Sequence, residues 1–143
     1  MNPRIEVAIT RTFEAEHSLP LVGAAQSHKH TYTLECGCFR EIDPQLGCAR
    51  PMQELTRDLD AVLAMIEGRS LNDVLPVPPT AEMLACWILA QLSPYWDWVS
   101  LRAYDGFMCK VERRHVLRLL ENMRQGEGPA GAPTAKRLRA PPA

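Results

Sequence analysis

Apolar and polar residues alternate along two segments near the N-terminus of the chain. In residues 4–18, Ile5, Val7 and Ile9 occupy every second position, and the alternation continues to the end of the segment. Residues 28–40 show the same period of two, with threonine, tyrosine and leucine side chains that suit a pleated surface. A period of two is typical of a strand with one buried face. The pattern therefore predicts two long strands that pair as a hairpin.

From Met52 onward the apolar spacing becomes that of a helix. Between residues 52 and 66 apolar side chains recur three or four positions apart, which predicts an amphipathic helix that begins just after Pro51. A second helix is expected to begin after Thr80, a residue type that caps helix N-termini, and to end before Pro94.

The next segment predicts a second hairpin. Residues 99–104 and 107–111 flank the pair Asp105-Gly106, which favours a tight β-turn. Residues 112–123 predict a short closing helix with Val116, Leu120 and Met123 turned inward. Two hairpins and a pair of helices predict an α+β domain, in which a four-stranded antiparallel sheet carries two antiparallel helices on one face. We expect another subunit to cover the opposite face.

Composition and charge narrow the classes of function. The chain has 143 residues, a length that predicts one domain. With 16 Lys+Arg and 17 Asp+Glu, it lacks the basic excess of a nucleic-acid binder. No apolar run has the length of a membrane span, and the N-terminal segment lacks signal-peptide features. We therefore expect a cytoplasmic protein that binds neither nucleic acid nor membrane. The domain is assigned to residues 1–123, and the Pro-, Ala- and Arg-rich residues 124–143 are predicted to be a disordered tail.

The five cysteines fit the same compartment. They are odd in number and contain no CxxC pair of the kind used by structural zinc sites and redox motifs. We interpret all five as reduced thiols.

Three of the four histidines follow the pattern H-x10-H-x-H. His28 and His30 lie two positions apart in one predicted strand, so their imidazoles leave the same face, and His17 on the paired strand can point to the same place. Three neutral imidazoles with a fourth position open are the ligand set of a catalytic zinc. On spacing alone, ordinary strand or loop histidines explain the pattern equally well.

Four ordered motifs give the chain a wider resemblance. They are Phe13-Glu14-Ala15-Glu16-His17, His28-Lys29-His30-Thr31-Tyr32, Leu71-Asn72-Asp73 and Pro79-Thr80-Ala81-Glu82. Over roughly residues 5–111 the chain resembles the 6-pyruvoyl-tetrahydropterin synthases and the bacterial 6-carboxy-tetrahydropterin synthases of queuosine biosynthesis. The four motifs together are far more specific than the histidines alone.

This resemblance implies the T-fold, or tunnelling fold, in which the sheets of several subunits close into a barrel. It implies trimers paired into hexamers, with active sites at subunit interfaces. It also implies a lyase that acts on dihydroneopterin triphosphate, with Zn²⁺ held by His17, His28 and His30. Thr80 and Glu82, in the fourth motif, are assigned to binding the small-molecule substrate.

Around the expected zinc site, however, the chain departs from the family pattern. The family places a Cys, or in some variants a Glu, shortly before the second motif, whereas residues 23–27 contain neither, and the Ser27 hydroxyl is a poor base at neutral pH. The family's Asp-His pair corresponds to Glu67-Gly68, which leaves Glu67 as the catalytic candidate. The Glu that anchors the pterin ring corresponds to Ala103, which cannot accept the hydrogen bonds of that ring.

Three more side chains are candidates for a changed site: Lys29, Tyr104 and Asp105. Each is equally well explained as a solvated strand or turn residue, and Asp105 in particular suits the tight turn. His115 lies outside the matched region and is expected on a helix surface.

The sequence thus leaves three hypotheses for function. The first is a zinc-dependent lyase or cyclase that resembles the pterin synthases but has been re-purposed for a non-standard substrate. The second is a genuine 6-pyruvoyl- or 6-carboxy-tetrahydropterin synthase with unrecognised substitutes for its base. The third is a non-catalytic T-fold subunit that retains the metal. In each case we expect a homo-oligomer.

Overall fold

The computed structural model describes residues 2–125 of the chain. Two long strands come first, followed by three helices, two short strands and a closing helix, with two single-turn 3₁₀ helices between them. Their bounds are β1 Arg4–Leu19, η1 Pro20–Val22, β2 Ala24–Glu41, α1 Met52–Leu63, α2 Leu71–Val74, α3 Ala81–Gln91, β3 Trp98–Arg102, β4 Met108–Glu112, η2 Arg113–His115 and α4 Leu117–Arg124. The predicted tail, 124–143, lies outside the described residues from position 126 onward.

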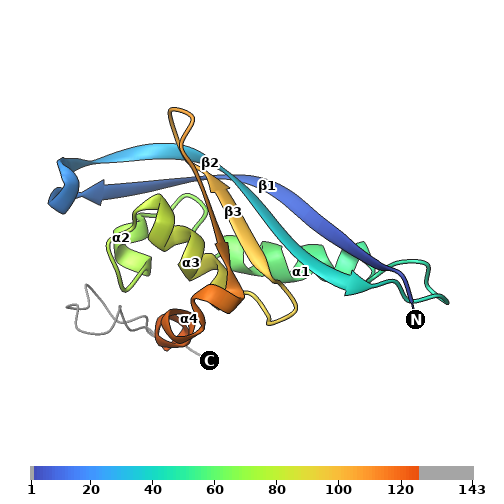
Figure 1. Ribbon diagram of the computed structural model, residues 1–143. Helices are drawn as coiled ribbons and strands as arrows, with labels where there is room; N and C mark the ends of the chain where they lie inside the picture. Colours follow the sequence, from blue (N-terminus) through green and yellow to red (C-terminus); the bar gives the residue numbers. More distant parts are fainter. Residues whose placement is uncertain (1, 126–143) are drawn as a thin grey trace, which may run out of the picture.

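The four strands form one antiparallel sheet in the order β1-β2-β3-β4, as predicted. β1 and β2 pair along almost their whole length, whereas β3 pairs only with residues Thr33 to Gly37 of β2. Figure 1 shows the β1–β2 ribbon extending well past β3, with the helices gathered on one side of the sheet. The part of β2 that precedes Thr33 therefore has a partner on one edge only.

The element boundaries differ from the predicted ones where turns decide them. β2 begins at Ala24 rather than at residue 28, because Gly23, with φ 85°, turns the chain tightly enough for Ala24 to pair with Leu19. α1 ends at Leu63 rather than at residue 66, since the next amides bond to carbonyls three residues back. Ile66 is nevertheless fully buried, so the apolar spacing found the core but not the helix end. The short helix α2 was not predicted.

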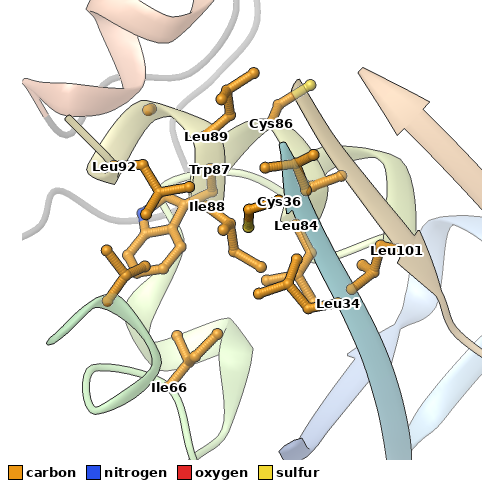
Figure 2. Close-up of a cluster of buried hydrophobic side chains, with 14 of the residues drawn as sticks. Leu34, Cys36, Ile66, Leu84, Cys86, Trp87, Ile88, Leu89, Leu92 and Leu101 are labelled. Atoms are coloured by element: carbon orange, nitrogen blue, oxygen red, sulfur yellow. The ribbon is translucent and has the colours of Figure 1, made fainter. Parts of the chain in front are cut away.

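The core lies between the sheet and the helices, and Figure 2 shows part of it. Leu34 and Cys36 of β2 and Leu101 of β3 face the apolar helix α3. The Thr80 side chain caps α3 by accepting a hydrogen bond from the amide of Met83 at 3.1 Å. The predicted alternation and the predicted cap are both confirmed, and they fix the face of each strand that meets the helices.

The other face of the sheet is polar. It carries threonine, serine, glutamate, lysine and arginine side chains, including Thr10, Glu35 and Lys110. Its large apolar groups are Phe39, Trp98 and Met108, and the Trp98 indole lies so close to Gly37 that it leaves no room for a side chain there. The predicted cover by another subunit stays a prediction. Within the described residues, no helix is both long and apolar enough to cross a membrane.

Candidate metal centre

Strand register brings three histidines together at the far end of the β1–β2 ribbon. His17 of β1 is the direct partner of His28 of β2, and His30 follows two positions later on the same face. The three imidazole rings lie edge to face, with centroids 4.6 to 4.9 Å apart. His17 is fully buried, while His28 and His30 are half-buried. We refer to these three residues as the histidine cluster.

Backbone carbonyls determine how two of the imidazoles are protonated. His17 Nδ1 lies 2.8 Å from the carbonyl oxygen of Pro79, and His28 Nδ1 lies 2.9 Å from that of Gln26. A carbonyl oxygen can only accept, so each Nδ1 must carry the proton and donate it. In the neutral rings both Nε2 atoms therefore present lone pairs, and these two atoms face each other at 2.9 Å.

The third imidazole adds an unpaired nitrogen to the same point. His30 Nε2 is buried and has no hydrogen-bond partner among the described residues. One ring nitrogen of each histidine lies within 4.8 Å of the others. Two opposed lone pairs and a third unpartnered nitrogen make a site of acceptors, which a cation would satisfy and to which no described residue donates. Three imidazoles are a donor set that zinc favours, so the residues present fit a zinc ion.

Burial favours the neutral form of His17 and His30, which is the form that binds a metal. Desolvation lowers the pKa of His17, and the neighbouring His28 lowers it further, against an opposing effect of the bond to Pro79. Desolvation also lowers the pKa of His30, together with its two histidine neighbours, while the charge of Asp105 acts in the opposite direction. Neutral imidazoles at physiological pH bind a metal without first losing a proton.

A loop docks on the free edge of β1 and holds His17 in place. The side chain of Asn72 accepts from the amide of Ser18 at 2.8 Å and donates to the carbonyl of the same residue at 3.0 Å. Further along the edge, the amide of Gly68 donates to Glu14 and the amide of Glu16 donates to Arg69. The Leu-Asn-Asp motif thus has a positioning role. The motif stood out in the sequence, but its role depends on tertiary docking and was not predicted.

Tyrosines flank the cluster on two sides. Tyr104, in the β3–β4 turn, stacks on His30 with ring centroids 4.3 Å apart, and Phe107 stacks behind it at 6.2 Å. The buried Tyr32 hydroxyl lies 3.5 Å from His17 Nδ1, and desolvation raises its pKa. Two of the predicted extra candidates, Tyr104 and Asp105, therefore lie beside the histidines.

The other candidates lie elsewhere. The carboxylate of the exposed Glu67 accepts from the amide of Glu14 at 3.3 Å, at the edge of β1. Lys29 lies on the opposite face of β2, 4.0 Å from a carboxylate oxygen of Glu16. The catalytic assignment of Glu67 stays a prediction.

The assigned substrate-binding residues flank the same region. The Thr80 hydroxyl is engaged in capping α3, directly after the carbonyl that holds His17. Glu82 is exposed on α3, and its charge acts on the thiols of Cys86 and Cys109. Both assignments stay predictions. His115 is exposed, as expected, and lies 3.8 Å from a carboxylate oxygen of Glu112.

Four of the five cysteines are unsuited to replace the absent base. All five are free thiols, in line with the sequence interpretation. Burial raises the pKa of Cys36 to about 12 and that of Cys109 to about 11, and it also raises the pKa values of Cys38 and Cys86. These groups stay protonated at neutral pH, so they do not act as thiolate bases.

Comparison with known proteins identifies the family. Residues 6–112 match the model of the family described as 6-pyruvoyl tetrahydropterin synthase. The chain belongs to the 6-pyruvoyl tetrahydropterin synthase family. The matched range contains the four strands except the first two residues of β1, and it contains all three histidines of the cluster.

Solved structures of the synthases share its fold. The 6-pyruvoyl tetrahydropterin synthase of Caenorhabditis elegans superposes with a TM-score of 0.72 at 17% identity, over 78% of this chain and 96% of that one. The Plasmodium vivax enzyme gives a TM-score of 0.63 at 14% identity, over 78% and 99% of the two chains. At such low identity the likeness shows the fold, which confirms the predicted T-fold.

A curated relative carries a different name. It is the dihydroneopterin monophosphate aldolase of Pyrococcus furiosus, which is 30% identical over 77 residues. The match covers 54% of this chain and 65% of the relative, so the chain spans somewhat less than two thirds of the relative's length. The family therefore includes proteins named as synthases and one named as an aldolase.

Proposed function

We propose that the chain is a zinc-dependent lyase of the synthase family that acts on a substrate other than the usual dihydroneopterin triphosphate. His17, His28 and His30 would hold the metal and leave a further position for substrate or water. A zinc ion bound there supplies Lewis acidity, which polarises a carbonyl or hydroxyl oxygen and makes the adjacent C–H or C–C bond easier to break.

The observation that carries this proposal is the opposed pair of Nε2 atoms of His17 and His28, 2.9 Å apart. Their Nδ1 atoms already donate to carbonyls, so in the neutral rings neither Nε2 has a proton to offer the other. The buried Nε2 of His30 has no partner among residues 2–125. Without a bound cation, all these nitrogens would lack a partner.

A change of substrate is supported by the groups that surround the cluster. By the resemblance, Ala103 occupies the position expected for the pterin-anchoring carboxylate. Burial raises the pKa values of Cys36 and Cys109, which makes these thiols poor bases. Instead, Tyr104 stacks against His30 and the charge of Asp105 acts on that ring. The acid–base chemistry would therefore use other groups, among which Glu67 remains the sequence-based candidate.

The named relative favours carbon–carbon cleavage as the reaction. A zinc ion can stabilise the carbanion that forms when such a bond breaks. The histidine cluster would hold an ion suited to that role. A genuine 6-pyruvoyl- or 6-carboxy-tetrahydropterin synthase, and a non-catalytic T-fold subunit, are the two competing functions.

Assembly into a homo-oligomer is part of the same proposal. β1 and β4 are the two edges of the open sheet. The docked loop occupies the edge of β1 only from Glu14 to Ser18, and the unpaired remainder of that edge invites pairing with another chain. Pairing of β1 with β4 of a second subunit would extend the sheet toward a closed barrel, as trimers or hexamers. The cytoplasmic location inferred from the sequence remains part of the proposal.

Substrate assays separate the candidate activities. The zinc-loaded protein is incubated with dihydroneopterin triphosphate or dihydroneopterin monophosphate, and release of triphosphate and of an aldehyde is followed. Aldehyde without triphosphate release supports the lyase proposal, and triphosphate release at a synthase rate overturns the change of substrate. If neither product forms while zinc is bound, pterin chemistry is excluded for this site. The His30→Ala variant is the control for metal dependence.

A further inference from the structure

A pocket lies near the histidine cluster but on the opposite, polar face of the sheet. Its cavity of about 310 Å³ lies where β2 meets the β3–β4 turn, and it is lined chiefly by Thr31, Thr33, Arg102, Tyr104, Asp105 and Phe107. Thr31 and Thr33 alternate with the buried Tyr32 and Leu34, so they point away from the helices. Nothing in the metal proposal uses this pocket.

The pocket offers hydrogen-bond donors without a matching acceptor. Among the described residues, the Arg102 guanidinium forms no ion pair and no hydrogen bond, although Asp105 lines the same cavity. Thr33 is the direct cross-strand partner of Arg102, so its hydroxyl lies on the same face beside the guanidinium. A planar fork of donors flanked by hydroxyls is the arrangement that recognises phosphate and carboxylate groups.

A neighbouring hollow adds a second positive charge. This cavity of about 250 Å³ shares Thr33 and Arg102 with the first one and is also lined by Ser100 and Lys110. The Lys110 ammonium is held 4.3 Å above the centre of the Trp98 ring, which keeps it on this face. Glu35 lines the same hollow, but its carboxylate accepts from Thr10 at 3.4 Å and forms no ion pair within the described part of the chain.

Tyr104 connects the pocket to the histidine cluster. It lines the cavity and at the same time stacks on His30. β2 has no β3 partner before Thr33, so no strand separates the two regions along this edge. Thr33 follows His30 by three residues, which corresponds to about 10 Å along an extended strand. Because His30 and Thr33 lie on opposite faces of β2, a small molecule somewhat longer than this spacing can reach from the histidines around the edge of β2 to Arg102.

We propose that Arg102, with Thr33 beside it and Lys110 nearby, forms a subsite for an oxyanionic group, a phosphate or a carboxylate, at the end of the substrate remote from the reacting bond. This inference rests on the proposed function for the location of the reacting end. Ala103, next to Arg102, has no side-chain acceptor, so this part of the pocket selects an acceptor-bearing substituent over a donor-bearing one.

Binding of small anions to the metal-free protein tests the pocket by itself. Inorganic phosphate and acetate are titrated separately, and the anion that binds more tightly identifies the kind of group. The Arg102→Gln variant should bind it at least about tenfold more weakly, as expected for a lost charge-assisted hydrogen bond. Arg57→Gln is the matched control, because Arg57 is exposed on α1 and lines neither cavity. Equal affinity in Arg102→Gln and the control, or no saturable binding of either anion, overturns the proposal.

The distance to the metal position tests the connection with the histidine cluster. In protein loaded with Co²⁺, paramagnetic relaxation of the ³¹P signal of bound phosphate should give a metal–phosphorus distance of about 10 Å. A distance of about 3 Å would mean that phosphate binds the metal itself, and no measurable relaxation would separate the two sites; either result overturns the subsite. If the histidines hold no metal but Arg102 still governs phosphate binding, the proposed function fails while the anion pocket stands.

Discussion

The histidine cluster and the β3–β4 turn touch through His30 and Tyr104, yet the chain holds them in different ways. His17 and His28 are fixed by strand register and by a carbonyl behind each ring. The turn is closed by a tight bend and two backbone hydrogen bonds, from Ala103 to Phe107 at 3.0 Å and from Phe107 to Tyr104 at 2.7 Å.

This difference indicates where specificity can change within the fold. The cluster is tied to long strands and to the docked loop, so a change there would disturb packing as well as metal binding. The side chains of residues 102–107 are mostly exposed and contribute little to the core. They can be exchanged at small cost in stability. We therefore attribute the choice of substrate in the proposed function to the turn and the proposed metal binding to the strands.

The largest expected effect is the loss of a histidine from the cluster. His30→Ala should lower zinc affinity by more than about 100-fold, since even changes behind the ligands cost about 10- to 100-fold. A competition titration with a zinc chelator measures this. His115→Ala is the matched control, because that histidine is exposed and remote. Similar zinc affinity in the two variants would contradict the assignment of the ligands.

Restoring a carboxylate in the turn should change ligand preference without touching the metal. Ala103→Glu places an acceptor where the resemblance expects the pterin anchor, and a charged hydrogen bond is worth about 1.5–3 kcal/mol. Neopterin should then bind at least about tenfold more tightly, as measured by fluorescence titration, while zinc affinity stays the same. Ala103→Gln is the control for size. If Ala103→Glu leaves neopterin binding unchanged, the comparison between turn and cluster loses its support.

Removing the two hydrogen bonds between the Asn72 side chain and Ser18 of β1 should weaken zinc binding by the histidine cluster indirectly. Asn72→Ala removes both hydrogen bonds to the backbone of Ser18, which costs about 1–3 kcal/mol of unfolding free energy and about tenfold in zinc affinity. Urea denaturation and the chelator titration measure the two effects. Asn122→Ala, on the peripheral helix α4, serves as control. A loss of stability with no loss of zinc affinity would show that the Asn72 side chain does not position His17.

The smallest effect concerns the pH dependence of the metal-free protein. The pKa values of His17 and His30 are lowered in the folded state, chiefly by desolvation. Below about pH 6.5, the ordinary pKa of histidine, these two side chains therefore bind protons more readily in the unfolded chain than in the folded one. The unfolding free energy is therefore highest above that pH and falls as the pH drops toward the lowered values. As the pH is lowered from 8 to 5, the melting temperature of the metal-free protein should decrease. The decrease should be less steep for the His30→Gln variant than for the wild type. A melting temperature that rises on acidification would exclude this explanation.

Local patterns predicted the parts of the structure that local rules govern. The period of two and the H-x-H spacing correctly predicted that three imidazoles meet on one face, since side chains two apart in a strand share a face. Thr80 was correctly predicted to cap α3, because a hydroxyl just before the first helical residue can accept from an amide of the first turn. The Asp105-Gly106 turn was also correctly predicted, and both residues have positive φ angles.

The remaining features depend on contacts between distant segments. The stacking of Tyr104 on His30 requires the turn to reach the unpaired part of β2, which no spacing reveals. The docking of Asn72 on Ser18 joins residues 54 positions apart. The donors around Arg102 become a pocket only when β2 and β3 are aligned in register.

Zinc analysis with X-ray absorption on the purified protein tests the central claim most directly. The account predicts one zinc per chain, bound by three imidazole nitrogens and one light, exchangeable ligand, with no sulfur in its shell. Zinc well below one per chain would contradict it. A fourth ligand from the protein would also contradict it, because a closed shell leaves no position for substrate and indicates a structural metal.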